Sequence, residues 1–454
     1  MPEQREFTSV EPTVIPTKSI SPSSIDADAL KVVRRLQRFG HTAYLVGGCV
    51  RDLMLKRRPK DFDVVTSARP GQVRKLFRNC RLIGRRFRLA HIHFRGKIIE
   101  TATFRGEAVN RDGSLLIRSD NVFGTESEDA RRRDFTINAL FYDPVEKLII
   151  DYVGGLEDLV ERVIKFIGDP GIRVQEDPVR MLRAIKFAGR LGFSIEANTW
   201  QAIVDFRHEI QKSAPPRLLD EILKMLRSGA SERSFRLMWE AGIMDVLLPE
   251  VSCYLSRSIV RDEERDPGAG LWSYLEALDK DDRDLVTNAV LVSVLLVHPV
   301  EDVVCGDCAG EYGLDVSSSA TGEIARAMLR NMSGRIRLPK KDAERIQQLL
   351  ASQRKLFMLR RNQPLPRSLM RRVYFPEALD LFEIGVGATK KGRRILNRLR
   401  GAFRQKAFSH RRTSRPGSKR VSGKKSGRKP LRNYKRGKAG KRKLSPGSRG
   451  KTTE

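Results

Sequence analysis

Apolar residues in the first part of the chain recur at two spacings, one typical of short helices and one typical of strands. Leu30, Val33 and Leu36 follow helical spacing within 26–39, and Asp26 stands where a helix cap is expected. Short apolar runs bounded by turn residues predict strands at 43–46, 62–65, 81–83, 90–94 and 97–103. Helices are expected between them at 50–55 and 70–77. The first part of the chain is therefore expected to be a mixed α/β head.

From about residue 158 the apolar spacing becomes helical and stays helical. The pattern predicts helices at 178–191, 199–212, 218–226, 232–241, 284–297, 320–328 and 341–350. Residues 110–121 are mostly polar and contain glycine, which predicts a mobile loop. No repeat of fixed period is present. The remainder of the chain is therefore expected to be all-α.

Charge adds a disordered tail and a polyanionic partner to this picture. The chain has 454 residues and a formal net charge of +32. Residues 401–454 hold 20 Lys or Arg and one acid among many Gly, Ser and Pro residues, so this segment cannot bury enough surface to fold and is expected to be a disordered basic tail. A basic tail can serve solubility alone. We instead expect the tail to bind nucleic acid, because its Lys and Arg side chains would neutralise phosphates and release the counterions bound there.

Cysteine content and the apolar runs indicate where the protein resides. Five scattered cysteines do not suit a disulfide scaffold and favour a reducing compartment. Residues 1–25 lack the apolar stretch of a signal peptide and are expected to form a flexible leader. The longest near-apolar run, 289–297, has about half the length of a bilayer span and predicts a buried helix. We expect a soluble protein of the cytoplasm.

The first candidate site is a glycine turn followed by two carboxylates. Gly47 and Gly48 lie between a predicted strand and a predicted helix, where backbone N–H groups can approach a phosphate. Asp61 and Asp63 are two residues apart in a predicted strand and would point to the same face. Two such oxygen ligands beside a phosphate site suit Mg²⁺. Each feature alone also occurs in structural roles, but the two together predict nucleotidyl transfer.

Three further segments carry candidate chemistry. Glu100 is the one acid in a mostly apolar strand, and a buried carboxylate needs a partner, so it is either a third active-site carboxylate or half of a structural ion pair. The arginines at 131–133 precede a predicted strand. They either hold a triphosphate through their planar guanidinium groups or form a solvated basic turn. Asp134, which follows them, could accept a hydrogen bond from a ribose hydroxyl.

The third segment reads E-D-P-V-R at 176–180. Asp177 precedes a proline at a predicted helix start, which taken alone favours a capping role for its carboxylate. Arg180 follows three residues later, near the same face of the helix. Together they could read a base edge. For adenine, Asp177 would accept from the exocyclic amine and Arg180 would donate to a ring nitrogen.

Five motifs occur in a fixed order along the chain: G-G-x-V-R-D, D-F-D-V, R-R-D-F-T-I-N-A-L, D-Y-V-G-G-L-E-D-L and E-D-P-V-R-M-L-R-A. In this order they closely resemble the class II template-independent nucleotidyltransferases, which comprise bacterial poly(A) polymerases and tRNA CCA-adding enzymes. The resemblance is dense over 44–191. It implies a nucleotidyltransferase head of about five mixed strands at 26–157. A helical neck at 158–245 and a helical, RNA-binding body at 246–400 follow, with the tail at 401–454.

The resemblance also implies roles for individual residues. Asp61 and Asp63 would bind two Mg²⁺ ions, and Asp134 rivals Glu100 as the third carboxylate. The triphosphate of ATP would lie near Gly47, Gly48, Arg51 and Arg133, with Asp134 near the ribose. Asp177 and Arg180 would recognise the base. The segment at 151–155 resembles a hinge between head and neck.

One segment bears on the choice between the two activities. L-I-G-R-R-F-R-L-A-H-I at 82–92 resembles the poly(A) polymerase branch, and the basic tail is a second feature of that branch. The expected activity is therefore the addition of AMP from ATP to RNA 3′ ends, with release of pyrophosphate. A tRNA CCA-adding enzyme is the first alternative. A catalytically inactive RNA-binding protein is the second.

Overall fold

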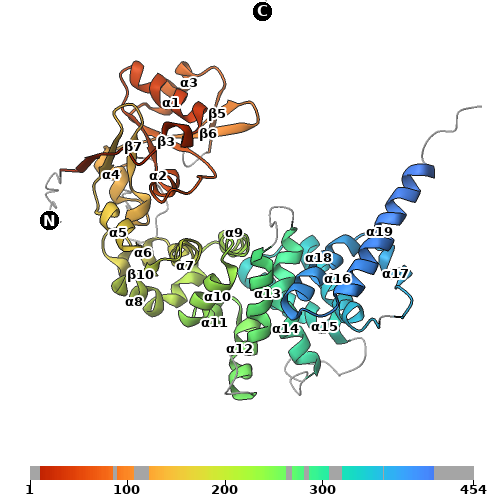
Figure 1. Ribbon diagram of the computed structural model, residues 1–454. Coiled ribbons are helices and arrows are strands. Elements are labelled where there is room, and N and C mark those ends of the chain that lie inside the picture. The colour runs from red at the N-terminus through yellow and green to blue at the C-terminus, as the bar shows by residue number, and fades with distance from the viewer. Residues whose placement is uncertain are drawn as a thin grey trace, which may run out of the picture. The chain divides into compact units, whose positions relative to one another are not determined.

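The computed structural model describes residues 11–84, 89–106, 122–261, 268–280, 286–305, 320–360 and 362–413. Residues 1–403 form one compact unit and 404–454 a second. Figure 1 follows the chain from a strand-containing head into a long succession of helices. The predicted α/β head and helical remainder are confirmed. The loop expected at 110–121, and residues 85–88 within the segment at 82–92, lie outside the described residues.

The head contains an eight-stranded sheet in the order β1-β8-β7-β2-β3-β6-β5-β4, so the expectation of about five strands was too small. β3 and β6 run parallel, and every other neighbouring pair in this sheet is antiparallel. The strands are β1 (Thr13–Pro16), β2 (Ala43–Val46), β3 (Asp63–Thr66), β4 (Cys80–Ile83), β5 (Leu89–Phe94), β6 (Lys97–Thr103), β7 (Phe141–Asp143) and β8 (Leu148–Asp151).

β1 shows that the prediction of a flexible leader over 1–25 was wrong for its second half. Thr13–Pro16 pairs antiparallel with β8 at the edge of the sheet. Val14 and Ile15 are 47% and 44% exposed, so this strand lacks the alternation of buried and exposed positions by which strands are recognised. A 3₁₀ turn (Pro22–Ser24) then leads into the first helix.

The head helices are α1 (Ala27–Arg38), α2 (Gly48–Met54), α3 (Pro70–Leu76), α4 (Glu126–Arg131) and α5 (Gly155–Glu161). α1 begins where the sequence predicts, because the Asp26 carboxylate accepts from the Asp28 and Ala29 amides at 2.8 and 3.2 Å. Leu45 and Val64 pack in one apolar cluster with α1, whereas their neighbours Val46 and Val65 pack in a second. Since alternate strand residues point to opposite faces, both faces of the sheet are covered.

A long series of helices follows the head, with a small parallel pair, β9 (Val163–Ile164) and β10 (Ser194–Ile195), near its start. The predicted helix at 199–212 is interrupted at Phe206, where α8 passes into a 3₁₀ helix (Arg207–Lys212). The helices are α6 (Pro170–Glu176), α7 (Val179–Leu191), α8 (Ala197–Asp205), α9 (Pro215–Leu226), α10 (Ser231–Glu240), α11 (Ile243–Leu247), α12 (Pro249–Arg261), α13 (Ala269–Lys280), α14 (Asn288–Cys305), α15 (Ala320–Ile336), α16 (Lys340–Phe357), α17 (Arg367–Met370), α18 (Phe375–Thr389) and α19 (Arg393–Thr413).

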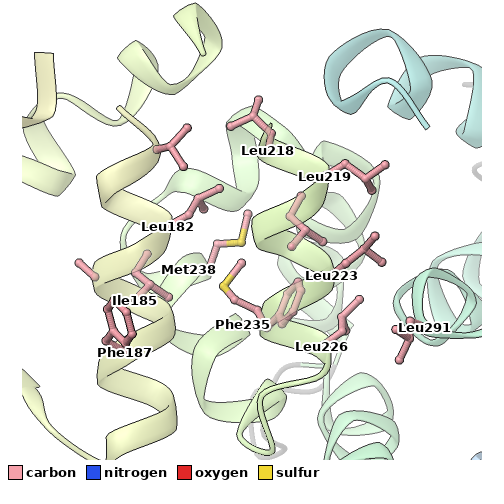
Figure 2. Close-up of a cluster of buried hydrophobic side chains, with 14 of the residues drawn as sticks. Leu182, Ile185, Phe187, Leu218, Leu219, Leu223, Leu226, Phe235, Met238 and Leu291 are labelled. Carbon is pink, nitrogen blue, oxygen red and sulfur yellow. The ribbon is translucent and has the colours of Figure 1, made fainter. Parts of the chain in front are cut away.

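α7 is held in place by α9 and α10. Figure 2 shows Leu182 and Ile185 of α7 facing leucines of α9, with Phe235 and Met238 of α10 between the two helices. α7 ends at Leu191 and is followed by Gly192, whose φ of 76° lies in the left-handed region that glycine readily adopts. The first turn of α7 carries Arg180, so this packing fixes the position of a candidate base-reading residue.

α14 contains the apolar run at 289–297. By length and composition it is the one helix among the described residues that could span a membrane, yet 67% of its apolar window is buried inside the protein. It packs against α12, α13, α15, α16 and α18. These contacts support the expected buried helix.

α19 shows that the tail begins later than predicted. The helix continues from Arg393 to Thr413, whereas the disordered tail was expected from Gly401. Ala402 and Phe403 pack against a small apolar cluster that includes Phe375 and Leu399. The remaining residues, 414–454, lie outside the described part of the chain.

Candidate active site

The glycine turn lies at the end of β2 and leads into α2. Gly47 has φ 76° and ψ −132°, and a Cβ atom there would lie 3.3 Å from Arg133 Nη1. Both the backbone angles and the close approach of this guanidinium therefore favour glycine. Gly48 is the first residue of α2, and a Cβ atom on it would lie 3.7 Å from Arg51 Nη2.

Asp63 is the first residue of β3 and lies beside the glycine turn. It pairs with Val46 of β2 on one side and with Glu100 of β6 on the other. Asp61 lies just before the strand, so the expectation that both aspartates belong to one strand was wrong. Glu100 was expected to be buried, but its side chain is 52% exposed and its Oε1 is 3.7 Å from His91 Nε2. Solvent therefore reaches all three carboxylates.

The three carboxylates affect each other electrostatically. Asp63 is open to solvent on one side, yet the surrounding protein desolvates its carboxylate and raises its pKa to about 6. The negative charge of Glu100 adds to this rise, and Asp61 adds a smaller part. Arg133 acts in the opposite direction. An excess of negative charge is thus concentrated at the start of β3.

This arrangement fits a magnesium site that is completed by substrate. Within the described ranges, no three His, Cys, Asp or Glu side chains form a closed group that could hold a metal by themselves. Mg²⁺ typically binds one or two carboxylates together with substrate phosphates and water. Desolvation is the larger cause of the raised pKa of Asp63, and a divalent cation would offset the negative charge that Glu100 and Asp61 add to it. Asp61 and Asp63 therefore have suitable chemistry for this ion.

Arg133 lies next to this acidic cluster. Its Nε and Nη2 donate to Asp129 Oδ2 at 3.1 and 2.8 Å, while Nη1 is the atom nearest Gly47. The segment at 131–133 ends α4 and does not directly precede a strand as predicted, because a 3₁₀ turn (Thr136–Asn138) intervenes before β7. Arg133 is therefore held by one carboxylate and faces the glycine turn.

Arg51 is buried, with an exposed fraction of only 2%. Its Nε and Nη2 donate to Asp52 Oδ1 at 2.9 and 2.7 Å, and its Nη1 donates to Asn138 Oδ1 at 2.6 Å. Its guanidinium also lies over the Phe187 ring, 5.0 Å from the centroid. These contacts tie α2 to α7 and to the 3₁₀ turn before β7.

Asp134 is paired within the protein and is not among the charges that shift the pKa of Asp63. Its Oδ2 is 2.6 Å from Arg183 Nη2, and its Oδ1 accepts from the Phe135 amide at 2.9 Å. Burial acts to raise the pKa of Asp134, but Arg183 and the hydrogen bonds outweigh it and hold the pKa below its ordinary value. Glu100, by contrast, is the register partner of Asp63.

The predicted base-reading residues lie at the junction of α6 and α7. Asp177 ends α6 and its side chain does not cap α7, so the capping interpretation was wrong. Its two oxygens accept from Arg217 Nη1 and Nη2 of α9 at 3.0 and 2.8 Å. Arg180 is nearly buried, and its Nη1 donates to Glu176 Oε2 and to the Arg173 carbonyl at 2.7 and 2.8 Å. The two residues are therefore fixed by different partners.

Sequence reasoning missed the residues that hold these side chains. Asp129 and Arg133 are four residues apart, a spacing that could have indicated their pairing. Arg183 lies three residues after Arg180 and could have been noticed in the same way. Asn138 and Arg217 reach their partners across the fold, and no local pattern predicts them.

Comparisons with known proteins match two regions of the chain. Residues 43–165 match the family model of the poly A polymerase head domain, and residues 192–255 match that of the probable RNA and SrmB-binding site of polymerase A. Poly(A) polymerase I of Escherichia coli O6:H1 is 47% identical over 257 residues, which are 54% of this chain and 55% of that protein. A CCA-adding enzyme of Lactobacillus johnsonii is 37% identical over 219 residues, which are 48% of this chain and 54% of that protein.

The chain thus spans about half the length of the curated relatives it matches. Among solved structures, an apo CCA-adding enzyme covers 89% of this chain, and 92% of its own length is matched, with a TM-score of 0.57 and 22% identity. A tRNA nucleotidyltransferase with a primer tRNA and an ATP analogue covers 83%, with 99% of its own length matched, a TM-score of 0.52 and 23% identity. At such identities the likeness concerns the fold. Residues 43–165 and 192–255 of this chain are thus similar to bacterial poly(A) polymerases, and the chain shares a weaker similarity with CCA-adding enzymes.

Proposed function

We propose that the protein is a template-independent polynucleotide adenylyltransferase that adds AMP from ATP to RNA 3′ ends and acts in the cytoplasm. The observation that carries this proposal is the meeting of a glycine turn, an arginine and a carboxylate cluster at the start of β3. Arg133 Nη1 faces Gly47, and Asp63 lies beside them in register with Glu100. This arrangement offers cations and backbone amides to phosphates, and carboxylates to Mg²⁺.

The chain's own residues mainly position the reactants. The triphosphate of ATP lies against the Gly47–Gly48 turn with Arg133 beside it, and the RNA 3′-hydroxyl attacks the α-phosphate in line. The new P–O bond replaces the bond to the β-phosphate, and pyrophosphate leaves. Asp61 and Asp63 would hold Mg²⁺, which when bound would supply activation of the hydroxyl and stabilisation of the leaving group. Charge placement dominates such a reaction, because little covalent chemistry is required of the protein.

Glu100, Arg51 and Asp134 take different parts in this proposal. Glu100 is the third carboxylate, since it is the register partner of Asp63. Arg51 and Asp134 are positioning residues, because Arg51 is buried and bonded to Asp52 and Asn138, and Asp134 is largely shielded from solvent and paired with Arg183. Arg51 orders α2 behind the glycine turn. Asp134 ties the turn after α4 to α7.

Base choice falls to Asp177 and Arg180. Arg217 holds both oxygens of Asp177, and Arg180 is anchored through one guanidinium nitrogen while its other nitrogens have no partner among the described residues. A fixed acceptor and a fixed donor suit the edge of one base. Identity to Poly(A) polymerase I exceeds identity to the CCA-adding enzymes, which supports adenine as that base.

Primer extension tests the proposal. The full chain, with Mg²⁺, is given a generic RNA or a tRNA lacking its 3′ end, with ATP or CTP singly and together. Long A tracts on both RNAs from ATP alone are expected. Addition that requires CTP and stops after C-C-A on tRNA would make the protein a CCA-adding enzyme. No incorporation at all, with RNA binding retained, would make it an inactive RNA-binding protein.

Matched variants connect the result to the site. Asp61→Asn and Asp63→Asn are expected to abolish transfer while leaving RNA binding largely intact. Glu146→Gln is the control. Glu146 is exposed in the turn between β7 and β8, whereas Gly47 follows Val46, which pairs with Phe141 at the other end of β7. Transfer at the wild-type rate by either aspartate variant would contradict the assignment of the metal ligands.

A further inference from the structure

A polar pocket opens on the head, and its lining includes one residue of the segment that carries Asp61 and Asp63. It has a volume of about 700 Å³ and lies between the segment that precedes α1 and the segment that connects α2 to β3. Phe62, which stands between Asp61 and Asp63, forms part of its wall. The pocket therefore reaches the same segment that carries the proposed metal ligands.

The pocket is strongly basic. Four cations from the segment after α2 line it, Lys56, Arg57, Arg58 and Lys60. All four are exposed. Arg57 donates to the carbonyls of Arg190 and Leu191 at 3.3 Å, which anchors this segment to the end of α7. The other three have no acidic partner in the part of the chain that the structure describes.

The one carboxylate of the pocket is already neutralised. Asp26 Oδ1 accepts from the Asp28 and Ala29 amides at the start of α1, and Asp26 Oδ2 is paired with Lys97. These contacts hold the pKa of Asp26 below its ordinary value even though burial opposes them. Asp26 therefore does not compensate the cations on the opposite wall.

The opposite wall supplies hydroxyl groups. Four exposed serines of the segment before α1 line the pocket, Ser19, Ser21, Ser23 and Ser24. Ser21 and Ser23 share a hydrogen bond of 2.8 Å, and Ser24 donates to the Ser21 carbonyl at 2.6 Å, so this wall is held by its own contacts. Hydroxyls facing lysine and arginine side chains form a typical lining for phosphate oxygens.

We propose that this pocket binds the phosphate backbone of the RNA acceptor, upstream of the 3′ end that reacts at Asp61 and Asp63. This inference rests on the proposed function. The occupant is a phosphodiester chain because three of the four cations have no acidic partner among the described residues and because the lining includes Phe62 of the metal-ligand segment. Phe62 is the one aromatic side chain in the lining, so the pocket offers little base stacking and is expected to bind without sequence preference.

RNA binding without transfer provides the test. Binding of a labelled single-stranded RNA to the full chain is measured in EDTA over a range of salt concentrations. The double variant Arg58→Ser with Lys60→Ser is expected to flatten the slope of log affinity against log salt by about 1.4, at about 0.7 per lost phosphate contact. Its affinity deficit should then shrink about 7-fold as salt rises from about 50 to about 200 mM.

Further variants distinguish a direct contact with RNA in the pocket from a general effect of lost positive charge, and thermal unfolding detects misfolding. Arg34→Ser with Arg38→Ser removes the same charge from exposed positions of α1 outside the pocket and should leave the slope unchanged. Ser21→Asp should weaken RNA binding at low salt, whereas Ser21→Ala should change it little. Thermal unfolding of each variant identifies any loss of fold.

Three outcomes would overturn the proposal. They are an unchanged slope in the double variant, an equal change in the α1 control, and a rise in the KM for ATP with no change in RNA affinity. An unchanged slope in the double variant would leave an acidic protein segment as the candidate occupant. A raised KM for ATP with unchanged RNA affinity would assign the pocket to the triphosphate of ATP. Because RNA binding is measured without Mg²⁺, a failure of AMP transfer itself would not imitate the first two outcomes.

Discussion

Asp63 and Glu100 are register partners on the parallel strands β3 and β6, and the charge of Glu100 contributes to a pKa near 6 at Asp63. Glu100→Gln removes that charge while keeping the shape of the side chain. We expect AMP transfer to fall by about 10- to 100-fold and to require more Mg²⁺, as when other groups that support a metal site are lost. The measurement is the transfer rate against Mg²⁺ concentration. A wild-type Mg²⁺ dependence would remove Glu100 from the site.

Asp134→Asn tests the other candidate for the third carboxylate. Because Asp134 is largely shielded from solvent and paired with Arg183, removing its charge leaves a guanidinium without its partner, and we expect a loss of stability of about 3 kcal/mol. Glu100 is half exposed, so Glu100→Gln should alter the midpoint of urea unfolding little. Loss of activity without loss of stability in Asp134→Asn would make Asp134 the third carboxylate instead.

Arg51 offers a similar separation of roles. Its guanidinium holds Asp52 and Asn138 in the interior, so Arg51→Met is expected to cost about 3–5 kcal/mol of stability. Arg51→Lys keeps the charge but loses the planar fork and should recover only part of that stability. Unfolding midpoints and the KM for ATP are measured for both. A large rise in KM with unchanged stability would show that Arg51 contacts the triphosphate directly.

The sequence was sufficient for elements whose signals are local. Asp26 before an apolar stripe predicted α1, and the glycine pair predicted the turn into α2. β1 escaped prediction because its pairing with β8 lies far along the chain and its side chains are exposed. The sequence motifs identified the candidate site residues but not the burial or the partners of their side chains. The sequence could not show that Arg51 is buried, that Glu100 is exposed, or that Arg217 holds Asp177, because each depends on contacts between distant segments.

The end of α19 sets where the tail can be removed without harm. Truncation after Thr413 keeps Phe403, whose ring lies 5.5 Å from that of Phe375, and removes most of the basic residues from 401 onward. We expect RNA affinity to fall and its salt slope to flatten, with stability unchanged. Truncation after Arg400 also removes the contacts of Phe403 with the small apolar cluster and should lower the unfolding midpoint. Equal stability of the two truncations would contradict this boundary.

His298 predicts a specific loss of stability in acid. Its ring packs between Tyr254 and Tyr274, and burial lowers its pKa from an ordinary value near 6.5 to about 4, although a hydrogen bond with the Gly270 backbone opposes the shift. The unfolded chain therefore binds a proton before the folded chain does. This contribution to stability is complete above pH 6.5 and is lost as the pH falls toward 4, by about 3 kcal/mol in total. The free energy of unfolding, measured in urea at several pH values in this range, should fall less steeply with falling pH in His298→Phe than in wild type. The variant His208→Gln, at an exposed position, should follow wild type.

Arg217 gives the sharpest test of base choice. It holds both oxygens of Asp177 and is itself 53% exposed, so Arg217→Ala should cost less than about 1 kcal/mol of stability. Freed from that pair, the Asp177 carboxylate can rotate, and we expect the preference for ATP over CTP, taken as the ratio of kcat/KM values, to fall about 10-fold. Lys212→Ala, which breaks an exposed ion pair with Glu209, is the matched control.

Arg180→Ala should relax the preference further but also destabilise the neck, because Arg180 is bonded to Glu176 and Arg173. An unchanged ATP preference in both arginine variants would mean that the α6–α7 junction does not read the base.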